Sequence, residues 1–145
     1  MSVSLIVALA VVAAALAVAA VIGTVVRRRS GVLRQVSNRI ELDTTDLGLS
    51  GTGPTVVHFS AVWCGPCAAV RRVVNQVCGE LDGVAHVEID MDIDPAAARR
   101  LSVLSLPTTF IFDADGRQRY RTAGVPRAAD LRAALQPLLA SPHPD

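Results

Sequence analysis

The sequence predicts an α/β domain, with a central mixed sheet flanked by helices, that follows one N-terminal transmembrane helix. Three observations predict this fold class. Residues 3–26 contain no charged side chain. From residue 55 onward, apolar strand patterns alternate with helix patterns, which is typical of α/β domains. Two cysteines lie where the first of these strands meets a helix. A chain of 145 residues has room for one ordinary domain and an appendage.

The appendage is the apolar N-terminal segment. As a helix, residues 3–26 reach about 36 Å at ~1.5 Å per residue, enough to cross a hydrocarbon core of ~30 Å. A cleaved signal peptide is the alternative, but its basic n-region is missing here. Arg27, Arg28 and Arg29 follow the segment, so the positive-inside rule places the rest of the chain in the cytoplasm. We therefore interpret residues 1–29 as a single-pass anchor with a basic flank.

Composition indicates a source but no substrate. All 14 basic residues are Arg, and together with the abundance of Ala and Val this favours a GC-rich bacterial genome and hence a bacterial cell membrane. A net charge of +1 excludes no class of partner, and we expect no nucleic acid among them. Three cysteines are too few for a disulfide-stapled scaffold.

The soluble part begins with a linker and continues as one domain. Residues 30–54 are rich in Gly, Ser and Thr and are interpreted as a tether with an opening strand at 39–42. Residues 55–145 form the domain, and a helix between its first two strands makes those strands parallel. A turn at 113–116 makes its last two strands antiparallel. The expected elements are strand 55–60, helix 64–78, strand 84–90, short helix 95–101, strands 108–112 and 118–122, and helix 126–139.

The motif that carries chemistry is Trp63-Cys64-Gly65-Pro66-Cys67, directly after the first of these strands. A thiolate at a helix N-terminus feels the positive end of the helix dipole, so its pKa falls and it becomes a nucleophile. Two cysteines separated by two residues can also close a disulfide and reopen it. A structural pair or half a zinc site is the alternative. With His86 the chain supplies only three zinc ligands, so we predict a redox pair and no metal site.

The spelling Trp-Cys-Gly-Pro-Cys resembles the thioredoxin family. Leu106-Pro107-Thr108 looks like the cis-proline turn of that family, and Gly124 lies where thioredoxins carry a glycine near the substrate groove. The resemblance covers about residues 55–139 and implies a thioredoxin-like fold. It also implies that Cys64 attacks a substrate disulfide and that Cys67 resolves the mixed disulfide, which are the roles that simple exchange chemistry gives them.

The resemblance also indicates where a client protein binds. The resemblance places the backbone beside Leu106 and Pro107 against the bound client, and the alternative is that Pro107 is an ordinary loop proline. A packing role is the alternative at Trp63. The expected client-binding residues are Trp63, Gly65, Pro66, Leu106, Pro107 and Gly124.

Two histidines depart from the family pattern. His58 stands where thioredoxins usually bury an Asp that helps to deprotonate the resolving cysteine, and His86 stands at the position of its Lys partner. A buried imidazole is neutral and can take a proton from Cys67, which makes His58 a candidate catalytic base; a core histidine with a backbone partner is the alternative. We expect His58→Ala to change the pH profile of the resolving step between ~6 and 8. Arg72 replaces a proline that kinks this helix in the family.

Cys78 lies near the other end of the helix that Cys67 begins. About 16 Å of helix separates the two at ~1.5 Å per residue, so Cys78 cannot bridge to the motif. A structural thiol is the favoured interpretation of Cys78, and a regulatory thiol is the alternative.

The leading functional hypothesis is a membrane-anchored thiol–disulfide oxidoreductase that reduces protein disulfides. It binds no cofactor, and its electrons come from NADPH through a thioredoxin-reductase-like partner. The Gly-Pro pair favours a reduction potential near −270 mV over an oxidant near −120 mV. The alternatives are an extracytoplasmic protein of the cytochrome-maturation type, with the anchor inserted the other way, and a non-catalytic docking module.

Overall fold

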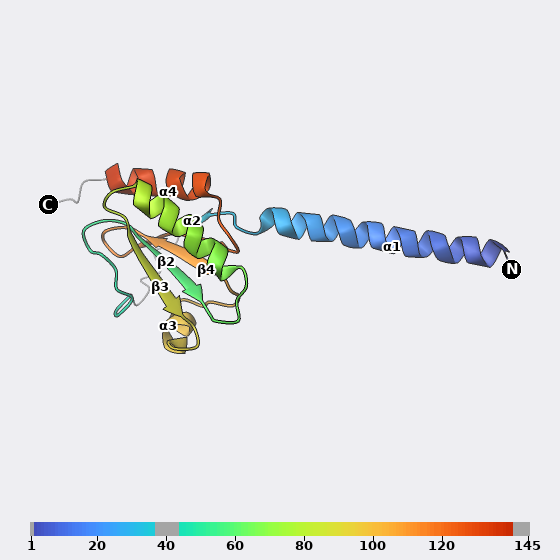
Figure 1. The fold of residues 1–145 in the computed structure, drawn as a ribbon, viewed down its shortest axis with the longest axis horizontal. Helices are drawn as coiled ribbons and strands as arrows, with labels where there is room; N and C mark the ends of the chain where they lie inside the picture. The colour runs from blue at the N-terminus through green and yellow to red at the C-terminus, as the bar shows by residue number, and fades with distance from the viewer. Residues whose placement is uncertain (1, 37–43, 141–145) are drawn as a thin grey trace. The chain divides into compact units, whose positions relative to one another are not determined.

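The computed structural model describes residues 2–36 and 44–140 (Figure 1). The chain divides into two units, Met1–Ser30 and Gly31–Asp145. The elements, in chain order, are α1 (Ser2–Arg29), β1 (Arg34–Gln35), β2 (Thr55–Ser60), α2 (Cys67–Glu80), β3 (Ala85–Asp90), α3 (Pro95–Arg100), β4 (Thr108–Phe112), β5 (Gln118–Ala123) and α4 (Ala128–Ala140).

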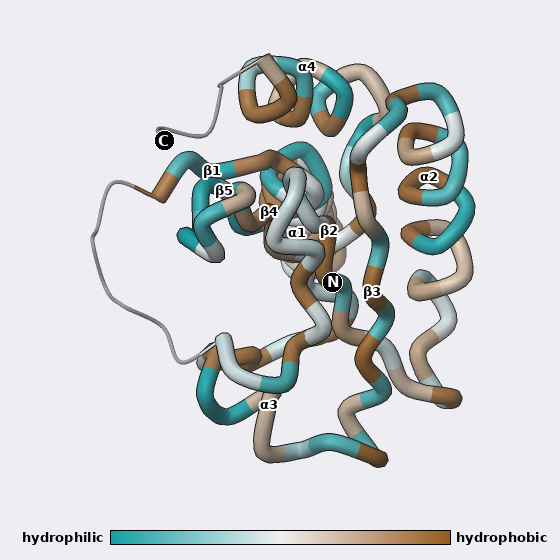
Figure 2. The backbone as a smooth tube through the Cα atoms, turned by 90° about the vertical axis from the view of Figure 1, so that its left-hand side faces the viewer, coloured by the Kyte–Doolittle hydropathy of each residue, from teal (hydrophilic) through white to brown (hydrophobic). Residues whose placement is uncertain are grey.

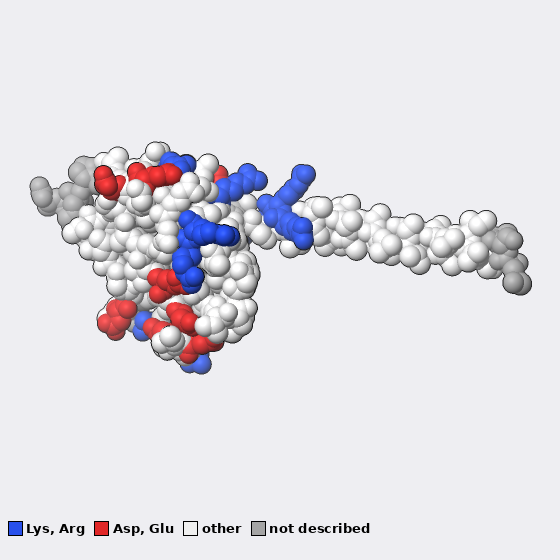
Figure 3. Space-filling model, in the orientation of Figure 1, with Lys and Arg blue, Asp and Glu red and all other residues white. Residues whose placement is uncertain are grey.

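The first unit is the long apolar helix α1. Its segment Ser4–Arg29 has the length and composition of a membrane span, and none of it is buried. Figure 3 shows no charged side chain along this helix until its C-terminal end, where Arg27, Arg28 and Arg29 lie. A signal sequence near an N-terminus has the same properties. The helix is therefore a candidate span.

The second unit is built on a five-stranded mixed sheet with the order β1-β5-β4-β2-β3. These labels follow one another from left to right in Figure 2. The pair β2 and β3 is parallel, as the βαβ pattern predicts, and β4 is antiparallel to both β2 and β5. The expected hairpin of the last two strands is therefore confirmed.

Alternation along the strands divides the core between the two faces of the sheet. On one face, Val57, Phe59, Phe110 and Phe112 pack with Ala97 and Ala98 of α3. On the other face, Val56 and Ile111 pack with apolar residues of α2 and α4, namely Val70, Val74, Val77, Leu131, Ala134 and Leu135. Even-numbered positions of β2 therefore face α2, and this parity places His58 beneath that helix.

The elements predicted within the described residues are confirmed, with bounds that differ by at most three residues. Strands 55–60 and 108–112 have the predicted bounds. The first domain helix begins at Cys67 and not at residue 64, because residues 64–66 form a turn in which the Cys67 N–H donates to the Cys64 carbonyl at 3.2 Å. The last helix begins at Ala128 and not at 126. The strand expected at 39–42 lies outside the described residues, and β1 instead pairs with β5.

Candidate active site

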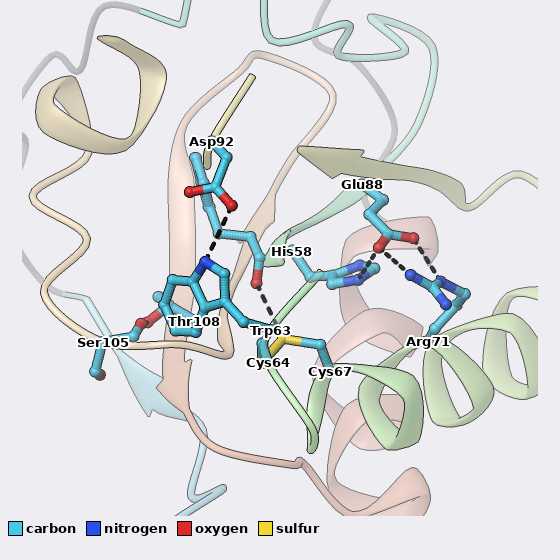
Figure 4. Close-up of a disulfide and its surroundings, with 10 residues drawn as sticks. His58, Trp63, Cys64, Cys67, Arg71, Glu88, Asp92, Ser105 and Thr108 are labelled. Carbon is cyan, nitrogen blue, oxygen red and sulfur yellow. Dashed lines mark hydrogen bonds and ion pairs between the residues drawn. A yellow bond between two sulfur atoms is a disulfide. The ribbon is translucent and has the colours of Figure 1, made fainter. Parts of the chain in front are cut away.

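A disulfide joins Cys64 and Cys67 at the point where β2 leads into α2 (Figure 4). Their Cα atoms are 5.5 Å apart. The side chain of Cys67 is buried, whereas Cys64 is half-buried. The Sγ atom of Cys67 lies 4.0 Å from the carbonyl oxygen of Phe59, so this sulfur rests against β2. A client disulfide can therefore reach Cys64 but not Cys67.

The turn before α2 brings the dithiol to the positive end of a helix. The Cys64 N–H donates to the Ala61 carbonyl at 3.0 Å, which closes the turn after β2. Pro66 is the N-cap of α2 and provides no side-chain hydrogen bond to its first turn. The first N–H groups of a helix have no partner within it, so they stabilise a thiolate nearby. Arg72 lies within α2, which runs without a break to Glu80.

The peptide bond between Leu106 and Pro107 is cis, in agreement with the family resemblance. Two hydrogen bonds hold this turn: the Gly124 N–H donates to the Pro107 carbonyl at 2.9 Å, and the Thr108 hydroxyl donates to the Ser105 carbonyl at 2.7 Å. Gly124 has a φ of +87°, which favours glycine. Pro107 is buried, while Leu106 and Gly124 are half-buried. The turn thus lies at the protein surface, and hydrogen bonds of Thr108 in β4 and of Gly124, directly after β5, hold it in place.

Trp63 lies in the loop that directly precedes the disulfide. Its side chain is 63% exposed, and its Nε1–H donates to Asp92 Oδ2 at 3.0 Å. Gly65 and Pro66 are also exposed. Figure 4 shows the Trp63 ring between Asp92 and the segment that carries Ser105 and Thr108, with Cys64 beside it. The motif, the loop after β3 and the cis-proline segment therefore meet at the end of the sheet where β2 and β3 finish and β4 begins.

Exposed aliphatic side chains occupy the same three segments. Val62 is 91% exposed, Ile93 is 84% exposed and Leu104 is 93% exposed. They lie one residue from Trp63, Asp92 and Ser105, respectively, which Figure 4 brings together. Sequence reasoning did not identify these residues, because an apolar residue in a loop gives no indication of its exposure. We call Val62, Ile93 and Leu104 the apolar rim, because each is the sequence neighbour of a residue that lies near the disulfide in Figure 4.

His58 is fully buried beneath α2 and contacts His86 of β3. The Nδ1 atom of His58 lies 2.8 Å from Nε2 of His86, and the two rings stack with centroids 5.0 Å apart. The Nδ1 atom of His86 lies 3.0 Å from Oδ1 of Asn75, an exposed residue of α2. The two predicted histidines thus form a pair, and Asn75 joins its outer end.

Glu88 lies on the other side of His58. It is the β3 residue in register with His58, and its Oε1 atom is 3.5 Å from His58 Nε2. Arg71 of α2 donates to both oxygens of Glu88, with Nε to Oε2 at 2.7 Å. Sequence reasoning missed Glu88, Arg71 and Asn75. Two spacings could have indicated them. Glu88 lies two residues from His86 on a strand and so shares its face, and Arg71 and Asn75 lie four residues apart on a helix and so share a face as well.

Burial controls the protonation of these groups. It lowers the pKa of His58 to about 4, although the Glu88 carboxylate acts in the opposite direction. Burial also lowers the pKa of His86. Hydrogen bonding from Arg71 holds the pKa of Glu88 at about 2. Both imidazoles are therefore neutral at pH 7, as expected for His58, whereas Glu88 is ionised.

The third cysteine is separate from this arrangement. Cys78 is a free, half-buried thiol that packs at the edge of the core between α2 and α4. Burial raises its pKa to about 11, so it is protonated and unreactive at neutral pH. Within residues 2–36 and 44–140, no group of three or more His, Cys, Asp or Glu side chains is arranged to hold a metal ion.

A dithiol with one accessible and one buried sulfur, at the start of a helix and close to a cis-proline turn, defines the class of thiol–disulfide oxidoreductases. Comparison with known proteins agrees. The Thioredoxin family matches residues 46–137. The chain is 36% identical to a thioredoxin of Mycolicibacterium smegmatis over 66% of its own length and 87% of that protein. It is 32% identical to the chloroplastic M-type thioredoxin of Chlamydomonas reinhardtii, over 70% and 74% of the two chains.

Solved structures give the same result for the fold. Chloroplastic thioredoxin z superposes with a TM-score of 0.56 at 36% identity, over 62% of this chain and 81% of that one. A mutant thioredoxin of Halobacterium salinarum superposes with a TM-score of 0.55 at 30% identity, over 63% and 78%. The chain therefore belongs to the thioredoxin family, and it is a thiol–disulfide oxidoreductase. Thioredoxins need no bound cofactor, and the family implies protein disulfides as substrates.

Proposed function

We propose that this chain is a membrane-anchored reductase of protein disulfides, held by α1 in a bacterial cell membrane with its thioredoxin domain in the cytoplasm. One observation carries the catalytic part of the proposal: Cys64 is accessible, while Cys67 is buried at the start of α2 and bonded to it. Such a pair separates the attacking sulfur from the resolving sulfur.

The reaction has two exchange steps. The Cys64 thiolate attacks one sulfur of a client disulfide; that S–S bond breaks, a mixed disulfide forms, and the other client sulfur leaves as a thiolate that takes up a proton. Cys67 then loses its proton and attacks Sγ of Cys64. The mixed disulfide breaks, the second client thiolate leaves and is protonated, and the Cys64–Cys67 disulfide closes. The client gains two electrons and the enzyme dithiol loses two.

His58 accepts the proton that Cys67 loses. It is fully buried, its pKa is lowered, and the next residue of β2, Phe59, contacts Cys67 through its carbonyl oxygen. A neutral imidazole in this place can act as a general base at pH 7. Because burial lowers the pKa of His58 to about 4, we expect His58 to lose this function as the pH falls toward 4, which is below the range of ~6 to 8 expected from sequence.

The client binds at the end of the sheet where β2 leads into α2 and where the dithiol lies. The cis-proline turn at Pro107 presents the backbone beside Leu106 to an extended segment, and Trp63, Gly65, Pro66 and Gly124 line the approach. The apolar rim adds three exposed aliphatic side chains to this surface. Exposed apolar side chains on segments that meet beside the disulfide are candidate contacts for a client protein. Clients are therefore proteins that expose apolar residues near a disulfide.

The anchor and the electron source complete the proposal. Arg27, Arg28 and Arg29 at the end of α1 favour retention of the domain on the cytoplasmic side. In the cytoplasm a thioredoxin-reductase-like enzyme reduces the Cys64–Cys67 disulfide at the expense of NADPH. If α1 is inserted the other way, the same dithiol serves an extracytoplasmic pathway of the cytochrome-maturation type.

Activity is tested with the full chain in lipid nanodiscs. The assay follows NADPH oxidation with a bacterial thioredoxin reductase and insulin as the client, and Cys64→Ser is the matched control. We expect insulin reduction by the wild type and none by the control. Reduction that requires dithiothreitol in place of NADPH and reductase would contradict the proposed electron source. The absence of reduction with either donor would favour a docking module.

Orientation is tested in intact cells. A membrane-impermeant thiol reagent is applied to cells that carry the Cys67→Ser, Cys78→Ser protein, which retains Cys64 alone. We expect Cys64 to be protected until the cells are lysed. Labelling in intact cells would reverse the topology and favour the extracytoplasmic alternative.

A further inference from the structure

Arg121 of β5 holds the backbone that leads from α3 into the turn at Pro107. Its Nη2 atom donates to the carbonyl of Ser102 at 2.6 Å, and its Nη1 atom donates to the carbonyl of Leu101 at 3.4 Å. These two residues directly follow α3. Ser102 has a φ of +50°, in the left-handed region that residues other than glycine seldom adopt. The chain therefore leaves α3 through an unusual turn whose carbonyls bind one guanidinium.

The guanidinium of Arg121 is itself held by the core. Its Cζ atom lies 5.0 Å from the ring centroid of Phe110, the fully buried β4 residue in register with Arg121. A cation over an aromatic ring is attracted by the negative face of the ring. Among the described residues Arg121 forms no ion pair, whereas Arg119 of the same strand pairs with Asp113 at 3.3 Å. The charge of Arg121 is thus directed to backbone carbonyls and not to a carboxylate.

The backbone that Arg121 holds continues into residues 103–107, which we call the client segment. β5 also leads to the contact at the other end of this segment, because the Gly124 N–H donates to the Pro107 carbonyl at 2.9 Å. Between the two ends, Leu104 is 93% exposed and Ser105 is exposed as well. Exposed side chains have little packing of their own, so the backbone on either side of them determines their positions.

The first half of the client segment has fewer attachments than the second half. In the second half, Leu106 packs against the core, and the Thr108 hydroxyl donates to the Ser105 carbonyl at 2.7 Å. In the first half, Val103 packs against the core and its N–H donates to a carbonyl of α3 at 2.8 Å. The contacts of Arg121 come directly before Val103. They therefore contribute a large share of what fixes Leu104.

We propose that Arg121 is a positioning residue for the protein client: by holding the backbone directly after α3, it fixes Leu104 and the rest of the client segment in place. Figure 4 shows Ser105 of this segment on the same side of the disulfide as Trp63. The inference rests on the client surface of the proposed function. Arg121 acts through the client segment and not on the reacting sulfur atoms. Its loss should therefore weaken client binding and leave the exchange chemistry in place.

Hydrogen exchange tests whether Arg121 holds the backbone. The N–H groups of Ser102 and Val103 donate to carbonyls of α3 at 3.0 and 2.8 Å, so their exchange rates report opening of this turn. The rates are measured by ¹⁵N NMR on the oxidised full chain in detergent micelles. In Arg121→Met, we expect both amides to exchange about tenfold faster, as for loss of a charged hydrogen bond, and the amides of β2 to keep their rates. Unchanged exchange at Ser102 and Val103 would overturn the inference.

Insulin reduction tests the consequence for the client. We expect Arg121→Met to raise the KM for insulin about fivefold and to change kcat by less than about twofold, because binding is weakened and the dithiol keeps its geometry. Arg121→Lys keeps the charge without the planar fork, so its KM should lie between those of the wild type and Arg121→Met. These two variants separate the loss of the fork from the loss of the charge.

Arg119→Met is the matched control. It removes the same charge from the same face of β5, and its partner Asp113 lies outside the client segment. We expect this variant to have the KM and the exchange rates of the wild type. Equal rises in KM for Arg119→Met and Arg121→Met would assign the effect to charge and overturn the inference.

The positioning role and the proposed function fail separately. Faster exchange in Arg121→Met with an unchanged KM would show that Arg121 only stabilises the turn after α3, and it would overturn the positioning role. Absence of insulin reduction by the wild type would refute the proposed function. The exchange rates need no client, so in that case they still decide whether Arg121 holds the client segment.

Discussion

His58 and His86 lie on neighbouring parallel strands with 2.8 Å between Nδ1 of one and Nε2 of the other. Their side chains meet because alternation on β2 and β3 turns both toward α2. The resemblance to thioredoxins implies an acid and an ammonium group at these positions. Here two neutral imidazoles occupy the same place, and their proton affinity is set by burial and by Glu88.

The first prediction concerns the resolving step. In the wild type its rate should stay nearly constant as the pH falls from 8 to 5 and should drop near pH 4, because burial lowers the pKa of His58 to about 4 and protonation removes the base. In His58→Gln the rate should be at least about tenfold lower at pH 7 and should rise with pH, following the ionisation of the Cys67 thiol. Single-turnover kinetics with a preformed mixed disulfide measure this, and parallel pH profiles for the two proteins would count against it.

The second prediction concerns stability. The folded pKa of His58 is lowered below its unfolded value, so its contribution is present above about pH 6.5 and is lost as the pH falls toward 4. At ~1.4 kcal/mol per unit of pKa shift, the free energy of unfolding should fall by about 3 kcal/mol over this range. Urea unfolding of the oxidised full chain in micelles measures it. Most of the decrease should disappear in His58→Gln; an equal decrease in that variant would assign it to other groups.

The third prediction concerns the apolar rim. Leu104→Arg should raise the KM for insulin several-fold and leave the reduction of a small disulfide such as oxidised glutathione unchanged, because only a protein client covers this surface. The change should not affect stability, since Leu104 is 93% exposed. Val32→Arg is the control, because Val32 is exposed and lies outside the three rim segments. Equal effects of both substitutions on insulin would refute a specific client surface.

The fourth prediction concerns Cys78. Its pKa of about 11 means that iodoacetamide at pH 8 should alkylate Cys64 of the reduced protein and leave Cys78 unmodified, as mass spectrometry of peptides will show. Cys78→Ala should keep the full rate of insulin reduction and lose about 1 kcal/mol of stability from a half-buried apolar contact. A slower rate in Cys78→Ala would revive the regulatory interpretation.

Local patterns predicted most of the fold. The strands at Thr55–Ser60 and Thr108–Phe112 are short apolar runs with turn residues beside them, and their bounds follow from this contrast. The start of α2 was harder to predict, because a Cys-Gly-Pro sequence fits a loop turn as well as the first turn of a helix. Strand β1 has only two residues, so it has too short a pattern to detect.

The site was predicted only where sequence motifs mark it. Short sequence motifs predict Cys64, Cys67 and the cis-proline turn, and the six-residue distance to Cys64 along the chain predicts His58. Glu88 and Arg71 could not be predicted as partners of His58, because their contacts depend on how α2 lies across β3. The apolar rim depends on three loops that come together only in the folded domain.

The most direct test of the central claim is to trap the mixed disulfide. Reduced full-length Cys67→Ser protein in nanodiscs is mixed with insulin, and the linked peptides are identified by mass spectrometry. We predict a stable adduct through Cys64, and none when Cys64→Ser protein is used in its place. An adduct through Cys67, or no adduct with either protein, would contradict the division of roles between the exposed and the buried sulfur.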